Sequence, residues 1–138
     1  MKMMKKIQTE TEIPATLKMR GKKIVEALGS SHCFVFVMFS PDAVGYIILE
    51  KNPHFPAFII YELFVIEDLR RRGYGKSMIQ FAEEYGKSKG ETHLFLWPYH
   101  VDNKTTDAYL REWYSKLGFK DARNEPGGLE KELIYRPG

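Results

Sequence analysis

The most informative stretch of this chain reads Arg70-Arg71-Arg72-Gly73-Tyr74-Gly75. It follows an apolar extended run over residues 57–66 and opens a helical pattern that continues to about residue 89. A strand that turns through glycines into a helix leaves backbone N–H groups exposed at the positive end of the helix dipole. Because Gly73 and Gly75 carry no Cβ, an anion can approach these groups closely. With three arginines, Lys76 and Ser77 at the same turn, the sequence predicts a pyrophosphate site.

The spacing of these glycines differs from two common phosphate-binding motifs. The dinucleotide-binding fingerprint needs G-x-G-x-x-G and the P-loop needs G-x-x-x-x-G-K-[ST], and neither occurs in this sequence. A second motif further along reads Tyr114-Ser115-Lys116-Leu117-Gly118-Phe119. It ends an amphipathic helical pattern, and Gly118 is placed where such a helix stops.

Together the two motifs resemble signatures of the GNAT superfamily of N-acetyltransferases, namely Gln/Arg-x-x-Gly-x-Gly/Ala and Tyr-x-x-x-Gly-Phe. The resemblance runs from roughly Cys33 to Ile134. It implies a single acetyltransferase domain over residues 1–138 with an α/β (α+β) fold. That fold has a mixed, mostly antiparallel sheet with helices on both faces, and its two central strands splay apart to admit the pantetheine arm.

The resemblance also implies a reaction, in which an acetyl group passes from acetyl-CoA, without a metal, to a primary amine of a small molecule or protein. The thioester and pantetheine then contact the backbone of the strand before the turn, which by position means Leu63, Phe64 and Val65. The nucleotide phosphates contact residues 70–77, and Lys116 lies in reach of them.

Two side chains carry the proton transfers that this resemblance implies. Tyr114 would be the general acid, because a phenol is protonated at neutral pH and can donate to the leaving thiolate. Glu62 would draw a proton from the acceptor amine or hold that amine as a cation. Relatives often carry Asn seven residues before the motif tyrosine, but this chain has Asp107 there and Asn103 one turn earlier. The pantetheine contact is therefore carried over to Asn103.

Each of these residues also has a purely structural explanation. Tyr114 continues the apolar stripe of its helix, the strand residues are ordinary core residues, and Glu62 is an ion-paired strand residue in that reading. Because these structural explanations are possible, two other functions stay open. One is a CoA-binding regulatory module without catalysis, and the other is a small basic RNA-binding protein, although no RNA-binding motif appears in the sequence.

Composition limits the remaining possibilities. The chain has 138 residues, a net charge of +3 and 28% charged residues, which fits one folded domain with a mild preference for anionic ligands. Cys33 is the only cysteine, so we expect neither a disulfide framework nor a thiolate metal site. No signal peptide or membrane-spanning run is apparent. We therefore expect a cytoplasmic protein that binds no nucleic acid or membrane, and a homodimer is left open.

The apolar pattern and the positions of glycine and proline predict a mixture of strands and helices along the chain. An edge strand is predicted over residues 7–13 and a helix over 17–28. Strands follow at 33–39, 44–50, 57–66 and 93–97, with a helix after the glycine turn and another over 106–117. Residues 119–122 and 129–135 are predicted to pair as a closing hairpin.

Overall fold

The computed structural model describes residues 2–98 and 106–135. Its strands are β1 (Met3–Ile7), β2 (Cys33–Phe39), β3 (Ala43–Glu50), β4 (Phe58–Val65), β5 (His93–Leu96), β6 (Lys120–Asp121) and β7 (Leu129–Glu132). Its α-helices are α1 (Gly21–Leu28), α2 (Tyr74–Ser88) and α3 (Asp107–Lys116). Short 3₁₀ helices lie at η1 (Glu10–Glu12), η2 (Ala15–Arg20) and η3 (Glu67–Leu69). Within the described ranges, no helix is long and apolar enough to cross a membrane.

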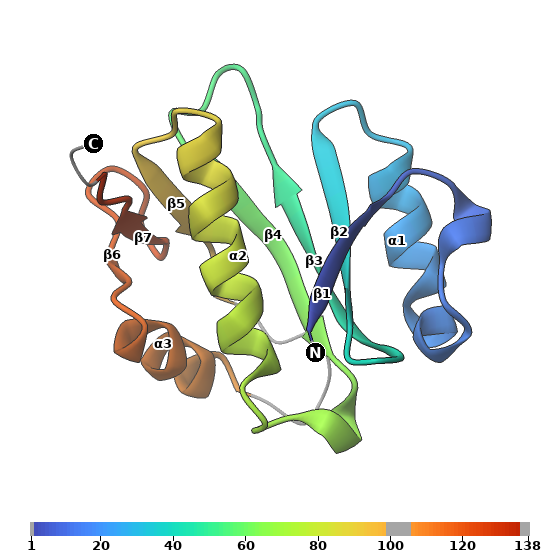
Figure 1. The fold of residues 1–138 in the computed structure, drawn as a ribbon. Helices are drawn as coiled ribbons and strands as arrows, with labels where there is room; N and C mark the ends of the chain where they lie inside the picture. The colour runs from blue at the N-terminus through green and yellow to red at the C-terminus, as the bar shows by residue number, and fades with distance from the viewer. Residues whose placement is uncertain (1, 99–105, 136–138) are drawn as a thin grey trace.

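In these residues, seven strands form one sheet in the order β1-β2-β3-β4-β5-β7-β6. Neighbouring strands run antiparallel, except that β4 and β5 are parallel. Helix α1 packs on one face through Ile24 and Ala27, whereas α2 packs on the other through Met78, Ile79 and Ala82 (Figure 1). This arrangement confirms the predicted α/β fold with helices on both faces of a mostly antiparallel sheet.

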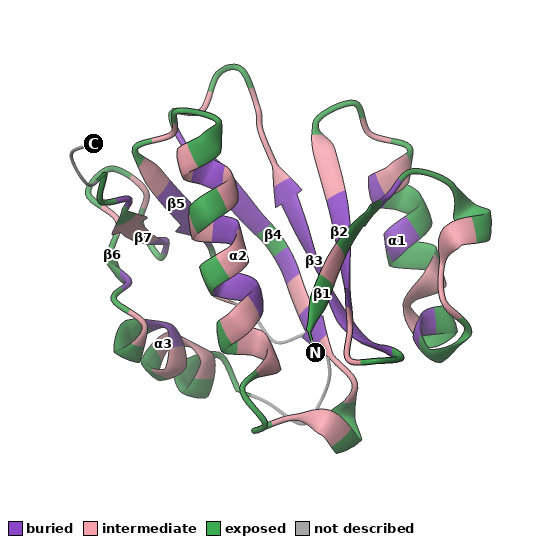
Figure 2. Cartoon of the chain, in the orientation of Figure 1, coloured by how far each residue is buried: buried purple, intermediate pink, exposed green. Residues whose placement is uncertain are grey.

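The middle of the sheet is buried on both faces. Strand β3 is buried from Ala43 to Leu49, and Figure 2 shows buried residues along most of β3 and β4. Strands covered on both sides read as continuous apolar runs rather than as an alternation. The sequence therefore predicts where these strands lie, but it does not reveal which face each side chain occupies.

Strands β4 and β5 splay apart soon after they begin. Their described partners are Phe58 with Leu94 and Ile59 with Phe95, after which β4 continues to Val65 without β5 beside it. The edge of β4 over residues 60–65 is therefore free of a parallel neighbour among the described residues. This confirms the splayed central pair that the resemblance implies.

The predicted edge strand over residues 7–13 is wrong. Strand β1 ends at the first of these residues, and η1 follows. The carboxylate of Glu12 accepts hydrogen bonds from the backbone N–H groups of Gln8 and Thr9, each at 3.0 Å. Thr9-x-x-Glu12 has the spacing of a capping box, so local side-chain bonds outweigh the alternating pattern.

The other predicted elements are present with shifted ends. The helix expected over 17–28 is divided, because residues 15–20 form the 3₁₀ helix η2 and the α-helix begins at Gly21. The closing hairpin forms, with Lys120 opposite Glu130 and Asp121 opposite Leu129, but it is shorter than expected.

Gly45 lets β3 approach β4 beside the splay, so Gly45→Ala should destabilise the fold. An added Cβ would lie 2.2 Å from the carbonyl oxygen of Phe64, and the strands would have to separate. We expect the free energy of unfolding to fall by roughly 1–3 kcal/mol in urea unfolding. Gly21→Ala is the matched control, since Gly21 has a helical φ of −56° and no atom within 4 Å of its added Cβ. Equal unfolding midpoints for the two variants would contradict the close approach.

Candidate functional site

One cleft gathers most of the residues that the sequence singles out. Its volume is about 760 Å³, and it is lined by β4, by the turn into α2, and by α3. The predicted site residues on its wall are Glu62, Leu63, Phe64, Val65, Arg70, Arg71, Gly73, Tyr74, Gly75, Lys76 and Tyr114. Among the described residues, Arg72, Ser77 and Lys116 lie off this wall. Asn103 lies outside the described residues.

The glycine turn ends in an exposed helix N-terminus. Gly73 is the N-cap of α2 and has a φ of +85°, a left-handed conformation that favours glycine. The backbone N–H of Ser77 donates the first intrahelical bond, to the carbonyl of Gly73 at 3.0 Å. The N–H groups of residues 73–76 therefore have no partner within the helix. Gly73, Tyr74, Gly75 and Lys76 all line the cleft, so the helix end that faces it has the free N–H groups and the positive dipole end that favour anions.

The basic residues of the turn differ in their surroundings. Arg70 is half-buried, and its Nε donates to the carbonyl of Val65 at 2.9 Å, which ties the strand end to the turn. Arg71 and Lys76 are exposed and line the cleft, whereas Arg72 is exposed away from it. The side chain of Lys116 is 74% exposed and lies 3.6 Å from the carboxylate of Glu112.

The two glycines of the motif meet different structural requirements. A Cβ added at Gly73 would meet no atom within 4 Å, so it would enter open space at the cleft. A Cβ added at Gly75 would lie 3.2 Å from the indole ring of Trp113. Gly75 therefore allows α3 to pack closely on the start of α2, a contact between helices that the motif alone does not reveal.

Backbone groups of β4 point into the splay. The N–H of Ile66 donates to the carbonyl of Val44 at 2.9 Å, so it faces β3. N–H directions alternate along a strand, which turns the amide of Phe64 toward β3 and those of Leu63 and Val65 toward the cleft. A bulge at Tyr61, where Ile48 pairs with Glu62 and the next residue pairs with Ile60, shifts this alternation within the part of β4 that lines the cleft.

Glu62 is buried in a closed network of hydrogen bonds. Its side chain is 4% exposed, and one carboxylate oxygen accepts from the guanidinium of Arg20 at 2.8 Å. The other oxygen accepts from the hydroxyl of Tyr46, which in turn accepts from Nε of Arg20 at 3.1 Å. Burial and the neighbouring carboxylate raise the pKa of the Tyr46 phenol well above its ordinary value, so this hydroxyl stays a donor.

Tyr114 combines packing with access to the cleft. It is 6% exposed, and its ring makes edge contacts with Trp113 at 4.9 Å and Phe119 at 5.5 Å between centroids. It also lines the cleft, as does the half-exposed Tyr109 on the same helix. The apolar stripe predicted for this helix is confirmed, because Leu110, Trp113 and Leu117 pack against the core that contains Tyr114.

Three residues near the site escaped the sequence analysis. Arg20 and Tyr46 contact Glu62 from positions distant in the chain, and no local pattern marks them. Lys2 is the third: its ammonium lies 2.9 Å from the hydroxyl of Ser77 and 5.6 Å from the ring centre of Tyr74. The start of the chain therefore lies beside the first turn of α2 (Figure 1).

Comparisons with known proteins agree on one family. Residues 2–119 match the model of the Acetyltransferase (GNAT) family. A curated relative, an uncharacterized N-acetyltransferase of Methanocaldococcus jannaschii, is 39% identical over 70 residues, which cover 51% of this chain and 29% of the relative. The match thus spans less than a third of that relative's length.

Solved structures show the same fold at low sequence identity. The ribosomal-protein-S18-alanine N-acetyltransferase from Escherichia coli has a TM-score of 0.71 at 15% identity, covering 99% of this chain and 97% of that one. The PaiA N-acetyltransferase from Thermoplasma acidophilum, in complex with coenzyme A, has a TM-score of 0.62 at 20% identity, covering 83% and 72%. With the family model matching most of its length, this chain belongs to the GNAT family of acetyltransferases.

Proposed function

We propose that this chain is a single domain, residues 1–138, that transfers an acetyl group from acetyl-CoA to a primary amine in the cytoplasm. One observation carries the proposal. A single cleft joins the anion-binding end of α2, the open edge of β4 and Tyr114 on α3. These are the three groups that phosphate binding, thioester binding and proton donation require.

The phosphates of CoA fit the start of α2. The N–H groups of residues 73–76 and the helix dipole favour negative charge, and Arg71 and Lys76 add positive charge at the cleft. Gly73 leaves open space there, as a close approach of phosphate to backbone needs. In this proposal Arg72, Ser77 and Lys116 contribute at longer range, and Lys2 joins them through its contact with Ser77.

The reacting atoms belong at the splay. Bound acetyl-CoA supplies an acyl group already activated as a thioester. The amides of Leu63 and Val65 donate along the open edge of β4, where they hold the pantetheine arm and polarise the thioester carbonyl. Tyr114, across the cleft, protonates the leaving thiolate.

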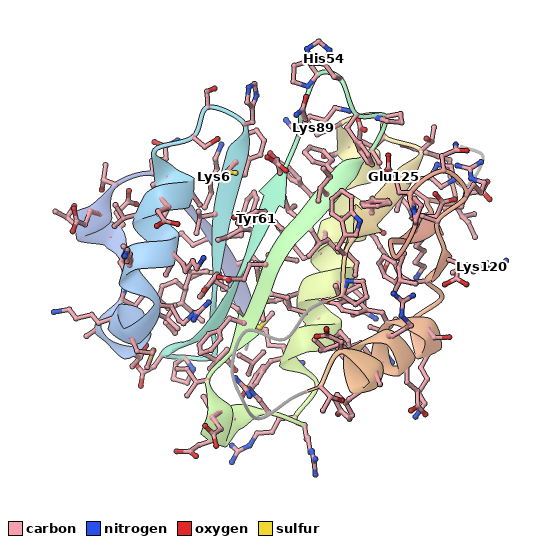
Figure 3. The ribbon with its side chains drawn as sticks, turned by 180° about the vertical axis from the view of Figure 1, so that it is seen from behind. Lys6, His54, Tyr61, Lys89, Lys120 and Glu125 are labelled. Carbon is pink, nitrogen blue, oxygen red and sulfur yellow. The ribbon has the colours of Figure 1, made fainter. Side chains whose placement is uncertain are left out.

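Glu62 serves the acceptor. It lies on β4 beside the thioester amides and is one of the residues that line the cleft, and its carboxylate pairs with Arg20. It draws a proton from the incoming amine through water or holds that amine as a cation. Tyr61, the exposed bulge residue next to Glu62, also lines the cleft and is labelled in Figure 3.

CoA should stabilise the protein, and acetyl-CoA should be consumed when the right amine is present. At a hundredfold over its dissociation constant a ligand adds about 2.7 kcal/mol to the free energy of unfolding. The measurements are thermal unfolding with and without CoA, and thiol release with a panel of small amines and peptides. The absence of a shift at millimolar CoA would reject the proposal. A shift without turnover of any amine would favour a regulatory CoA-binding module.

Gly73→Ala should weaken CoA binding far more than Gly90→Ala does. The two glycines have similar φ values, +85° and +78°, and neither has an atom within 4 Å of its added Cβ. Each substitution should therefore cost roughly 1–2 kcal/mol of stability through backbone strain. Only the Cβ at Gly73 enters the cleft, so calorimetric titration with CoA should separate the variants. Equal affinities would place the phosphates elsewhere.

Tyr114→Phe should lower turnover and leave CoA affinity unchanged. Only the hydroxyl is lost, and the ring contacts with Trp113 and Phe119 persist. A general acid contributes typically 10²–10⁴-fold, so kcat should fall within that range. Tyr109→Phe, on the same helix and the same cleft, is the comparison variant and should stay close to wild type. A larger loss in Tyr109→Phe than in Tyr114→Phe would reverse the assignment.

A further inference from the structure

The network around Glu62 joins three separate parts of the fold. Arg20 ends η2, Tyr46 lies in β3, and Glu62 lies in β4. Arg20 donates to both other members, and Tyr46 donates to the remaining carboxylate oxygen, so the three side chains close a ring of hydrogen bonds. No buried side-chain polar atom among the described residues lacks a partner, so each polar atom buried in this network makes at least one hydrogen bond.

Aromatic packing supports the same network. The ring of Phe64 stacks on that of Tyr46, with centroids 5.6 Å apart and planes at 30°. The guanidinium of Arg20 lies 5.3 Å from the centre of the same Phe64 ring. Arg20 and Tyr46 are thus held by packing as well as by polar bonds, and neither lines the cleft.

A carboxylate in this setting has few orientations available. One of its oxygens accepts a hydrogen bond from Arg20 and the other accepts one from Tyr46, and these two bonds fix the plane of the group. A carboxylate can accept about four hydrogen bonds, so lone pairs remain for a group in the cleft. The Arg20 charge offsets the Glu62 charge, and the pair can therefore stay buried next to the thioester amides.

We propose that Arg20 and Tyr46 are positioning residues for acetyl transfer, which fix the Glu62 carboxylate so that its remaining lone pairs face the acceptor amine. They act through Glu62 and touch neither substrate. The inference rests on the proposed function, because it assigns Glu62 a role in the same reaction. It adds to the residues required for the reaction two that lie outside both sequence motifs, Arg20 and Tyr46.

A double-mutant cycle tests this role. The variants are Arg20→Met, Arg20→Lys, Tyr46→Phe and Glu62→Gln, together with Arg20→Met and Tyr46→Phe each combined with Glu62→Gln. The measurements are kcat and KM for an amine that wild type acetylates, and CoA affinity by calorimetry. Tyr46→Phe keeps the ring that stacks on Phe64, so it reports even where Arg20→Met folds poorly. Lys18→Met removes an exposed charge from the same 3₁₀ helix and is the control.

Arg20→Met should lower kcat/KM for the amine by up to about 100-fold, since misplacing a reacting group by about 1 Å has effects of that size. Tyr46→Phe should lower it less, and Arg20→Lys should recover part of the loss because it keeps the charge without the planar fork. The CoA affinity of these variants should match that of wild type. The control Lys18→Met should match wild type in kcat/KM as well. In the Glu62→Gln background, further substitution of Arg20 or Tyr46 should change turnover by less than about twofold, because residues that act as a unit are not additive.

Two other outcomes have distinct meanings. Losses that persist undiminished in the Glu62→Gln background would overturn the positioning role, because Arg20 and Tyr46 would then act independently of Glu62. Wild-type protein that binds CoA but acetylates no amine would reject the proposed function, and the positioning role with it.

Discussion

Strand β4 pairs with β3 along most of its length, with a bulge at Tyr61, and among the described residues it pairs with β5 only at Phe58 and Ile59. On the side without a neighbouring strand, its backbone faces the cleft. The cost of unpaired backbone groups is large in a buried sheet, so such an edge persists only where water or a ligand reaches it. The rest of the site follows from this edge. The turn after β4 brings the start of α2 to one end of the cleft, and α3 closes the opposite side.

Close contacts then fix these parts relative to one another. Arg70 bonds the carbonyl of Val65, and Gly75 admits the indole of Trp113, so strand, turn and both helices meet within one small region. Gly45 lets β3 lie close to the same segment of β4. Bulkier side chains at either glycine would separate elements that the proposed reaction needs together.

The sequence predicts the parts of this site that depend on local chemistry. The glycine turn follows from φ requirements and charge, and the end of α3 at Gly118, which has a φ of +98°, follows from helix capping. The partners of Glu62 do not follow, because Arg20 and Tyr46 lie 42 and 16 residues away in the chain. The sequence does not reveal the 3₁₀ helix η1 for a different reason. Residues 7–13 alternate as a strand would, but the side chain of Glu12 accepts hydrogen bonds from nearby backbone N–H groups and favours the turn.

The splay also divides the sheet mechanically. Strands β1–β4 form one part and β5–β7 the other. Backbone pairing between them is limited, among the described residues, to two residue pairs of β4 and β5, whereas α2 and a shared apolar core pack across both parts. Glu83 of α2, for example, lies 2.8 Å from the ammonium of Lys131 on β7. In native-state hydrogen exchange, segments with few neighbours open at a lower free energy than the buried core does. A molecule that lies in the cleft contacts β4, the turn into α2 and α3, which are the elements that line it. Its binding would slow amide exchange unevenly: most in β4, the start of α2 and α3, and in β5–β7 only through their packing against α2 and β4.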